Sequence, residues 1–298
     1  MDALSDDGRL GVTVIAFLGS VFSPWYALAR RGTRALDPLE HSCFHVALYR
    51  AGSGGARVPR RWTMTERGAA AVQRDRHALR IGRSAMRWDG GMLRITLDEV
   101  TAPLPTRVRG EIRVRPRALC DHEAVLDTAS DHRWTPIAPS ARVEVALDRP
   151  DLRWTGDGYW DGNSGAGAIE DAFRRWHWCR MPLGGGRTAI DYEAERRNGE
   201  RTTLALLVRA DGGVEQREPE QRRQLERTRW GIGRALRADN GARVVRTLVD
   251  APFYARTAVR VGVMGEVSVG VHESLDCDRF RRPWVQAMLP FRVPRAPW

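Results

Sequence analysis

The stretch RVRGEIRVRP, residues 107–116, decides the fold class. Its residues alternate almost strictly, so that Val108, Ile112 and Val114 share one side of a strand while arginines occupy the other. Successive side chains of a β-strand point to opposite faces, and this alternation is typical of an antiparallel strand with one buried and one solvated face. ARVEVAL (141–147) repeats the pattern. We therefore expect an antiparallel sheet.

Short runs with strand character recur along the whole chain, punctuated by 29 Gly and 16 Pro. Besides the two above, the expected strands are 11–22 (ending in a turn), 43–50, 61–68, 79–90, 92–100, 170–181, 187–196, 201–210, 227–237, 242–248, 256–262 and 264–273. Asp89-Gly90-Gly91 has hairpin turn chemistry, and 212–226 reads as a charge-rich connection. The chain is predicted to be all-β. A break near Pro150 divides it into two consecutive antiparallel barrel or sandwich domains, 1–150 and 151–298.

Composition excludes a disordered chain, because 42% of the residues are hydrophobic and 29% are charged. The net charge of +11 is spread along the sequence and indicates a solvated basic surface. Attraction to an anionic membrane surface is the alternative. Nucleic-acid binding ranks last, since there is no basic helix, zinc spacing or RNA-binding signature.

Four cysteines, Cys43, Cys120, Cys179 and Cys277, stand far apart without a CxxC pair. This spacing argues against a metal site, and reduced thiols in the cytoplasm are expected, since no signal peptide is visible. The apolar run 11–22 is too short to cross a bilayer. A following loop, SPWYALARRG (23–32), could offer aromatic side chains to a membrane surface.

The candidate site lies in RWTGDGYWDGNSGAGAIEDAFRRWHWCRMPLGGGRTAIDYE, residues 153–193, which holds four Trp, two Tyr and several acids. In TAIDYEAE, Asp191 and Glu193 share one strand face and Tyr192 lies on the other. If the acids point inward, their repulsion raises one pKa; if Tyr192 points inward, the acids are solvated. On pattern alone the second arrangement is favoured. Asp161 is either catalytic or bonded within its own Gly-rich turn.

Other candidates surround these acids. Trp176 and Trp178 share a strand face opposite His177, and they line either a core or a ligand wall. His272 and Glu273 could activate water, although strand neighbours point to opposite faces. Acids at 276 and 278 are expected to pair with arginines. No nucleophile elbow, P-loop, zinc-protease or dinucleotide motif is present in the sequence.

Several long segments together resemble one family, the carotenoid 1,2-hydratases, also called hydroxyneurosporene synthases. The segments are LSDDGRLGVTVIAFLGSVFSPWYA, RWTMTERG, IGRSAMRWDG, LRITLDEV, WTPIAPSARVEV, GYWDGNSGAGAIEDAFRRWHWCR, LVDAPFYAR and VHESLDCDRFRRPWVQAMLPFRVPR. They cover nearly the whole chain in order. The resemblance implies a lipocalin-like two-domain β fold. It also implies a cofactor-independent lyase that adds water to the terminal C1–C2 double bond of an acyclic carotenoid such as neurosporene or lycopene, beside the inner membrane of photosynthetic bacteria.

Hydration of that end group needs a proton at C2, which leaves a tertiary cation at C1 for water to capture. Burial keeps a carboxylic acid protonated, and Trp faces stabilise a cation. No metal or redox cofactor is required. The catalytic candidates are Asp161, Asp191, Tyr192, Glu193, His272 and Glu273. The substrate-binding candidates are Tyr159, Trp160, Asn163, Trp176, His177 and Trp178.

The sequence departs from the family pattern at three positions that bear on activity. Gly162 and Ser164 stand where the family has patterns such as DSNEG, and Glu193 follows Tyr192 where an aspartate is usual. Two other functions stay open at this stage: a non-catalytic binder of an apolar isoprenoid, and a cyclase or isomerase on the same scaffold.

Overall fold

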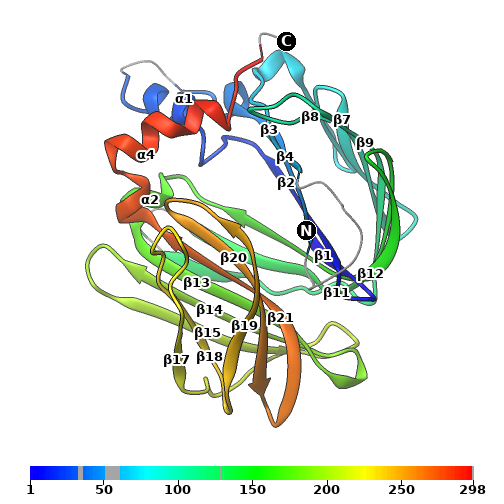
Figure 1. Ribbon diagram of the computed structural model, residues 1–298, viewed down its shortest axis with the longest axis vertical. Helices are drawn as coiled ribbons and strands as arrows, with labels where there is room; N and C mark the ends of the chain where they lie inside the picture. Colours follow the sequence, from blue (N-terminus) through cyan, green and yellow to red (C-terminus); the bar gives the residue numbers. More distant parts are fainter. Residues whose placement is uncertain (33–35, 51–60, 128, 130, 297–298) are drawn as a thin grey trace. The chain divides into compact units, whose positions relative to one another are not determined.

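The computed structural model describes residues 1–32, 36–50, 61–127, 129 and 131–296. They form antiparallel β-sheets with a few short helices between them (Figure 1). The predicted all-β fold class is confirmed.

The first sheet has 12 strands in the order β4-β3-β2-β1-β12-β11-β9-β8-β7-β6-β5, with β10 paired to β11. Their bounds are β1 Asp2–Ser5, β2 Leu10–Phe17, β3 Cys43–Arg50, β4 Arg61–Met64, β5 Val72–Arg74, β6 Ala78–Ile81, β7 Ser84–Asp89, β8 Met92–Val100, β9 Arg107–Pro116, β10 Ala124–Asp127, β11 His132–Arg149 and β12 Asp151–Ser164. Most neighbours in the sheet are also neighbours in sequence, which is typical of a meander of hairpins.

The second sheet has seven strands in the order β16-β15-β14-β13-β21-β20-β19, and a separate pair joins β17 to β18. Their bounds are β13 Phe173–Pro182, β14 Thr188–Arg196, β15 Arg201–Val208, β16 Val214–Gln216, β17 Arg222–Leu225, β18 Arg234–Arg237, β19 Ala242–Asp250, β20 Tyr254–Val263 and β21 Glu266–Asp276. The pairing of β13 with β21 brings together segments almost 100 residues apart.

Alternation sets the register of the first sheet, as the sequence predicts. In β9, Val108, Ile112 and Val114 are fully buried, and Ile112 lies opposite Val145 of β11. Gly110 interrupts the alternation with φ +144, and a Cβ there would come within 2.5 Å of the Ala146 carbonyl oxygen. This close approach requires glycine where the register of β9 and β11 shifts.

The described residues belong to two compact units. One comprises Met1–Pro116, Ala141–Gly158 and Gln286–Trp298, and the other Arg117–Ser140 and Tyr159–Val285. The long strands β11 and β12 contribute residues to both. The domain boundary at residue 150 stays a prediction. In the second unit, the core packs Cys179, Met181 and Val259 against Leu236 of β18.

The helices are short: α1 Pro24–Ala29, α2 Ile169–Ala172, α3 Cys277–Phe280, α4 Pro283–Met288, and the 3-10 turns η1 Pro38–His41, η2 Ala69–Ala71, η3 Gly184–Gly186 and η4 Leu289–Phe291. Where the sequence predicts a loop, α1 is present because Ser23 caps it: its Oγ accepts from the backbone N–H groups of Trp25 and Tyr26, each at 3.1 Å. Pro24 fills the first helical position, where no N–H is needed.

Several segments differ from the sequence-based expectation. The Gly-rich turn expected around Asp161 is wrong, because residues Asp151–Ser164 form strand β12. Of the strand expected at 227–237, only β18 forms, because Gly231 at φ +76 closes a turn in which Thr228 accepts from the Ile232 N–H. The segment expected as a connection carries β16 and β17. The four cysteines are free and buried, and burial raises the pKa of Cys43 to about 12. In the part of the chain that the structure describes, no helix has the length and apolar character needed to span a bilayer.

Candidate active site

The seven-stranded sheet presents two chemically different faces. Across β13 and β14, Trp178 lies opposite Tyr192 and Cys179 lies opposite Asp191. Across β13 and β21, Trp178 lies opposite Glu273. Because directly paired residues point to the same side of a sheet, Trp178, Tyr192 and Glu273 share one face and Asp191 lies on the other.

Aromatic rings cover the first of these faces. The Tyr192 ring lies 5.4 Å from that of Trp134 and 6.3 Å from that of Trp176, and the Trp178 ring lies 5.0 Å from that of Tyr159. We call these five residues the aromatic face. Trp176 is half-buried and the other four are buried, so Trp176 is the ring most open to a ligand.

Two carboxyl groups lie at the aromatic face. Asp161 Oδ2 accepts a hydrogen bond of 3.0 Å from Trp134 Nε1, and Glu273 Oε1 pairs with Arg256 at 2.7 Å. Burial raises the pKa of the Tyr192 phenol well above its ordinary value, and the negative charges of Asp161 and Glu273 add to the effect. Tyr192 therefore stays protonated at neutral pH and keeps an O–H that can donate a hydrogen bond at this face.

Asp191 lies on the opposite face, where burial raises its pKa to about 7 against the opposing effect of Arg217. Its Oδ1 accepts from Arg217 Nη2, and Arg217 also pairs with Glu220. Among the described residues, no hydrogen-bond donor reaches Asp191 Oδ2.

Glu193 shares this opposite face with Asp191 and is held by two arginines. Its Oε1 pairs with Arg222 at 2.8 Å and its Oε2 with Arg237 at 3.0 Å. The side chain keeps only 13% exposure. The expectation that the acid face is freely solvated when Tyr192 points to the aromatic side is therefore wrong for these two acids. Arginines pair with both acids instead.

Two histidines lie on the same side as Asp191. The His177 and His272 rings stack 5.9 Å apart, and burial lowers the pKa of each to about 3. His272 Nε2 donates to the Ala235 carbonyl oxygen at 2.8 Å, and His177 Nδ1 lies 2.8 Å from Ser274 Oγ. Both rings are neutral at ordinary pH. His272 and Glu273, considered together from the sequence, point to opposite faces.

A family model described as carotenoid hydratase CrtC matches residues 14–298. The chain belongs to this carotenoid hydratase family.

Curated relatives of the family share much of the sequence. The chain is 50% identical over 298 residues to the acyclic carotenoid 1,2-hydratase of Thiocapsa roseopersicina, covering 99% of this chain and 72% of that protein. It is 46% identical over 300 residues to that of Rubrivivax gelatinosus, with coverage of 99% and 72%. The Cereibacter sphaeroides protein of the same name is 42% identical over 287 residues, with coverage of 95% and 98%. These relatives are named as hydratases, so the chain is assigned to a family of hydro-lyases.

Among solved structures, the chain resembles the crystal structure of a protein described as AttH from Nitrosomonas europaea. The TM-score is 0.58 with 13% sequence identity, covering 93% of this chain and 90% of that one. At this identity the likeness concerns the fold alone, and it agrees with the lipocalin-like architecture expected for the carotenoid hydratase family.

The remaining candidates of the family resemblance lie around the end of β12. Trp160 is half-buried, and Asn163 and Ser164 are exposed. A Cβ at Gly162 would meet Ile137 Cδ1 at 3.6 Å, an ordinary contact, so the backbone there could carry the larger residue usual in the family. Asp276 and Asp278 pair with arginines, as predicted, and Asp276 also caps α3 through the Arg279 N–H.

Sequence reasoning missed three residues around the two faces. Trp134 stands in WTPIAPSARVEV and alternates with neighbouring strand residues, a signal that could have placed it on a sheet face. Arg256 and Arg217 carry no such signal, because their carboxylate partners lie 17 and 26 residues away. Among the described residues, no cluster of three or more His, Cys, Asp or Glu side chains is arranged to hold a metal ion.

Proposed function

We propose that the chain is an acyclic carotenoid 1,2-hydratase, which adds water across the terminal C1–C2 double bond of a neurosporene- or lycopene-type polyene. Membership of the carotenoid hydratase family supports the substrate class. The observation that carries the proposal is the placement of Asp161, which accepts from Trp134 beside the buried Tyr192 phenol. A carboxyl group among aromatic rings can bind an apolar alkene and give it a proton.

In this mechanism Asp161 is the acid. It is half-buried in the free protein, and a polyene end lying over it excludes water. Removal of water penalises a carboxylate relative to the carboxylic acid, and the mechanism uses Asp161 in its carboxylic acid form. Transfer of its proton to C2 breaks the C1–C2 π bond and leaves a tertiary cation at C1. The faces of Trp176 and Trp178 then stabilise this cation.

Water completes the reaction. Its oxygen forms a bond to C1, and one of its protons goes to the Asp161 carboxylate, which restores the acid for the next turnover. Glu273 is the second carboxylate at this face and can orient the water, and the Tyr192 O–H is a further hydrogen-bond donor at the same face. The sum is alkene plus water giving a tertiary alcohol, and protein groups alone carry every proton.

Asp191 is the alternative acid, because its pKa of about 7 leaves it partly protonated at neutral pH. Its position opposes this role. It points away from the aromatic face and is bound by Arg217, so a substrate over Trp176 does not reach it. We assign Asp191, with Glu193, to the ion-pair network that holds the loop before β17.

The test is hydration of lycopene or neurosporene in detergent, followed by the gain in mass of one water. The unchanged protein should form this product, and its absence would favour a non-catalytic binder; an isomer without added mass would favour a cyclase or isomerase. Asp161→Asn should lower kcat by about 100-fold or more, the usual contribution of a positioned acid. The matched control, Asp191→Asn, should retain turnover within about three-fold if folded. The reverse order of losses would move the acid to Asp191.

We also propose that the chain reaches this substrate by peripheral contact with a membrane, where an acyclic carotenoid dissolves. An apolar polyene does not diffuse through water at useful concentration, so the protein must collect it from a lipid phase.

A further inference from the structure

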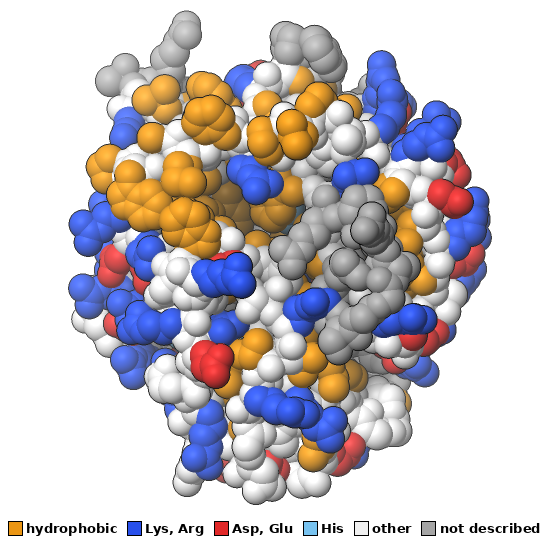
Figure 2. Space-filling model, in the orientation of Figure 1, with side chains coloured by type: hydrophobic (Ala, Val, Ile, Leu, Met, Phe, Trp, Pro, Cys, Tyr) orange, Lys and Arg blue, Asp and Glu red, His pale blue; other side chains and the backbone are white. Residues whose placement is uncertain are grey.

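Helix α1 and the segment 286–296, both in the first unit, carry strongly exposed apolar side chains: Leu28 at 65%, Met288 at 42% and Phe291 at 71%. Leu28 belongs to α1, and Met288 and Phe291 belong to the segment 286–296 close to the end of the chain. Figure 2 shows hydrophobic side chains gathered on this part of the surface, over the place that α1 and α4 occupy in Figure 1. We call Leu28, Met288 and Phe291 the apolar tip.

Both segments of the apolar tip are firmly anchored. Trp25 Nε1 donates to the Val293 carbonyl oxygen at 3.0 Å, which ties α1 to the later segment. The Tyr26 ring lies 4.8 Å from that of His41, and Ala27 is buried. The exposure of Leu28 is therefore a consequence of how α1 is fixed, since its neighbours face inward.

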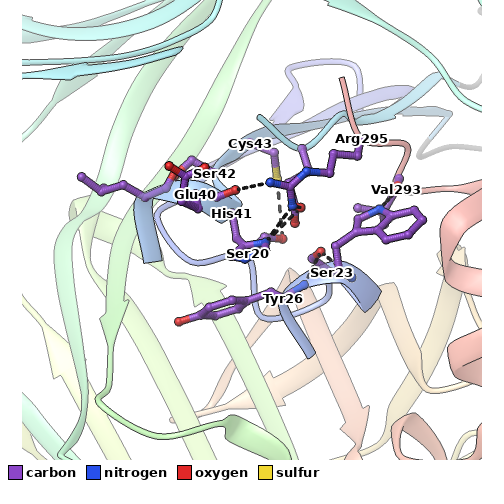
Figure 3. Close-up of polar contacts among 12 residues, drawn as sticks. Ser20, Ser23, Tyr26, Glu40, His41, Ser42, Cys43, Val293 and Arg295 are labelled. Carbon is purple, nitrogen blue, oxygen red and sulfur yellow. Dashed lines mark hydrogen bonds and ion pairs between the residues drawn. The ribbon is translucent and has the colours of Figure 1, made fainter. Parts of the chain in front are cut away.

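A buried ion cluster fixes the later segment in the same way. Glu66, whose side chain is fully buried, accepts from Arg295 Nη1 at 2.7 Å and lies 3.0 Å from His41 Nδ1. The backbones pair as well: the Glu66 N–H donates to the Pro294 carbonyl oxygen at 2.9 Å, and the Ala296 N–H donates to that of Glu66 at 2.9 Å. Figure 3 shows Arg295 and His41 pointing toward one another, with Arg295 Nη1 3.2 Å from His41 Nδ1.

The two segments that carry the apolar tip have charged side chains of one sign. Residues 24–32 and 286–296 contain Arg30, Arg31, Arg292 and Arg295 and no Asp or Glu. Arg31 and Arg292 are exposed, whereas Arg295 is occupied by Glu66. Exposed apolar side chains rimmed by arginines fit a surface that is apolar inside and anionic at its boundary.

We propose that the apolar tip inserts into the headgroup region of an anionic lipid bilayer, with Arg31 and Arg292 against the lipid phosphates. The binding step itself needs no substrate, and only its purpose rests on the proposed function. Trp25 and Tyr26, the residues that the sequence offered for membrane contact, serve instead as the inward anchors of the helix that carries Leu28.

The experiment is co-sedimentation of the full chain with vesicles of equal parts phosphatidylcholine and phosphatidylglycerol, and with vesicles of phosphatidylcholine alone. The unchanged protein should bind the anionic vesicles at least about ten-fold more strongly. The double variant Leu28→Glu/Phe291→Glu should lose about ten-fold or more of this binding. Val267→Glu is the control. The exposed fraction of Val267, 63%, is similar to the 65% of Leu28, but Val267 belongs to β21 and not to the apolar tip.

A charge variant tests the same surface without touching apolar residues. Arg31→Gln/Arg292→Gln should weaken binding to the anionic vesicles and reduce its salt dependence, whereas Arg74→Gln/Arg76→Gln, at two exposed arginines of the same unit, should change both less. Equal binding by the unchanged protein and the Leu28/Phe291 variant overturns the proposal. The proposal is also overturned if the unchanged protein binds no vesicles but self-associates, and the Leu28/Phe291 variant loses that self-association. The apolar tip would then be an interface between two copies.

Hydration assays separate this proposal from the proposed function. The Leu28/Phe291 variant should hydrate lycopene in detergent micelles at the rate of the unchanged protein and fail with lycopene embedded in vesicles. Vesicle binding without any hydration would remove the proposed function and leave the docking surface in place. Normal hydration of vesicle-embedded lycopene by the variant would contradict the docking proposal alone.

Discussion

Asp191 and Tyr192 are neighbours in β14 but present their side chains to opposite faces of the seven-stranded sheet. Asp191 pairs with Arg217, and Tyr192 packs 5.4 Å from the Trp134 ring. Two adjacent residues therefore belong to two environments, one held by ion pairs and one made of aromatic rings. We place the proton transfer in the environment made of aromatic rings.

Replacing Trp134 by Phe should lower turnover without unfolding the protein. The change keeps an aromatic ring against Tyr192 but removes the N–H that donates to Asp161, so the carboxyl group is no longer held in one position. We expect kcat for detergent-solubilised lycopene to fall about ten-fold or more, with a smaller change in KM. The control is Trp160→Phe, and equal effects of the two changes would contradict the positioning role.

Tyr192→Phe should show whether the phenol takes part in proton transfer. It removes only the O–H, and the ring contacts with Trp134 and Trp176 remain possible. We expect kcat to fall by about ten-fold, less than for Asp161→Asn, because the phenol orients groups and its raised pKa makes it a poor acid. The fall in kcat is measured as a function of pH for Tyr192→Phe and for the unchanged protein. A greater loss than in Asp161→Asn would make Tyr192 the donor.

Asp191 should make stability depend on pH near neutrality. Its folded pKa of about 7 lies above the ordinary 3.8, so between these values the folded chain holds a proton that the unfolded chain has released. This contribution is complete below 3.8 and is lost as pH rises through 7. Urea unfolding should show the free energy of unfolding of the unchanged protein falling relative to Asp191→Asn as pH rises from about 4 to about 8.

The stacked histidines should produce the opposite trend in acid. The pKa of His272 is about 3 when folded and 6.5 ordinarily, so the unfolded chain binds more protons between these values. Stability should therefore fall as pH drops from 6.5 towards 3, by on the order of 1 kcal/mol per pH unit for each buried histidine. His272→Gln should flatten this slope in urea unfolding. An unchanged slope would show that His272 is not the group responsible.

Arg295→Ala should destabilise the first unit, because it leaves the fully buried Glu66 side chain with His41 as its remaining side-chain partner among the described residues. Arg295 is 38% exposed, so solvent screens part of the pair and we expect a loss of about 2 kcal/mol. The control Arg292→Ala, at an exposed arginine in the same segment, should cost less than about 0.5 kcal/mol. Thermal unfolding of both variants measures the difference.

Local patterns predicted much of the fold. Alternation in 107–116 placed Val108 and Ile112 in the core, because the two-residue period of side chains depends on the strand alone. The same rule put Trp176 and Trp178 on one face and His177 on the other. Helix α1 was missed because it depends on the Ser23 cap, which the alternation of apolar residues does not report. The Ser23-Pro24 pair in the sequence was the available signal.

The site could be predicted only in part, because its partners come from distant segments. Whether Asp191 or Tyr192 faces the rings depends on Trp134, some 60 residues earlier, and on Arg217, which lies beyond the next strand. A strand pattern reports that two faces differ, but not which elements will cover each one. The roles of Asp161 and Asp191 therefore become distinguishable only once the sheet has formed.

The pairing of residue 66 with residue 295 sets an order of events during synthesis. A ribosome releases β4 long before it has made Arg295, so the growing chain carries the Glu66 carboxyl group without its arginine while the next 229 residues are added. Until Arg295 has been made, water must solvate the Glu66 carboxylate. The buried cluster of Glu66, His41 and Arg295 cannot form before then. The surface we propose for lipid contact is thus assembled only after residues 286–296 have been made, which delays any encounter with a bilayer until that point.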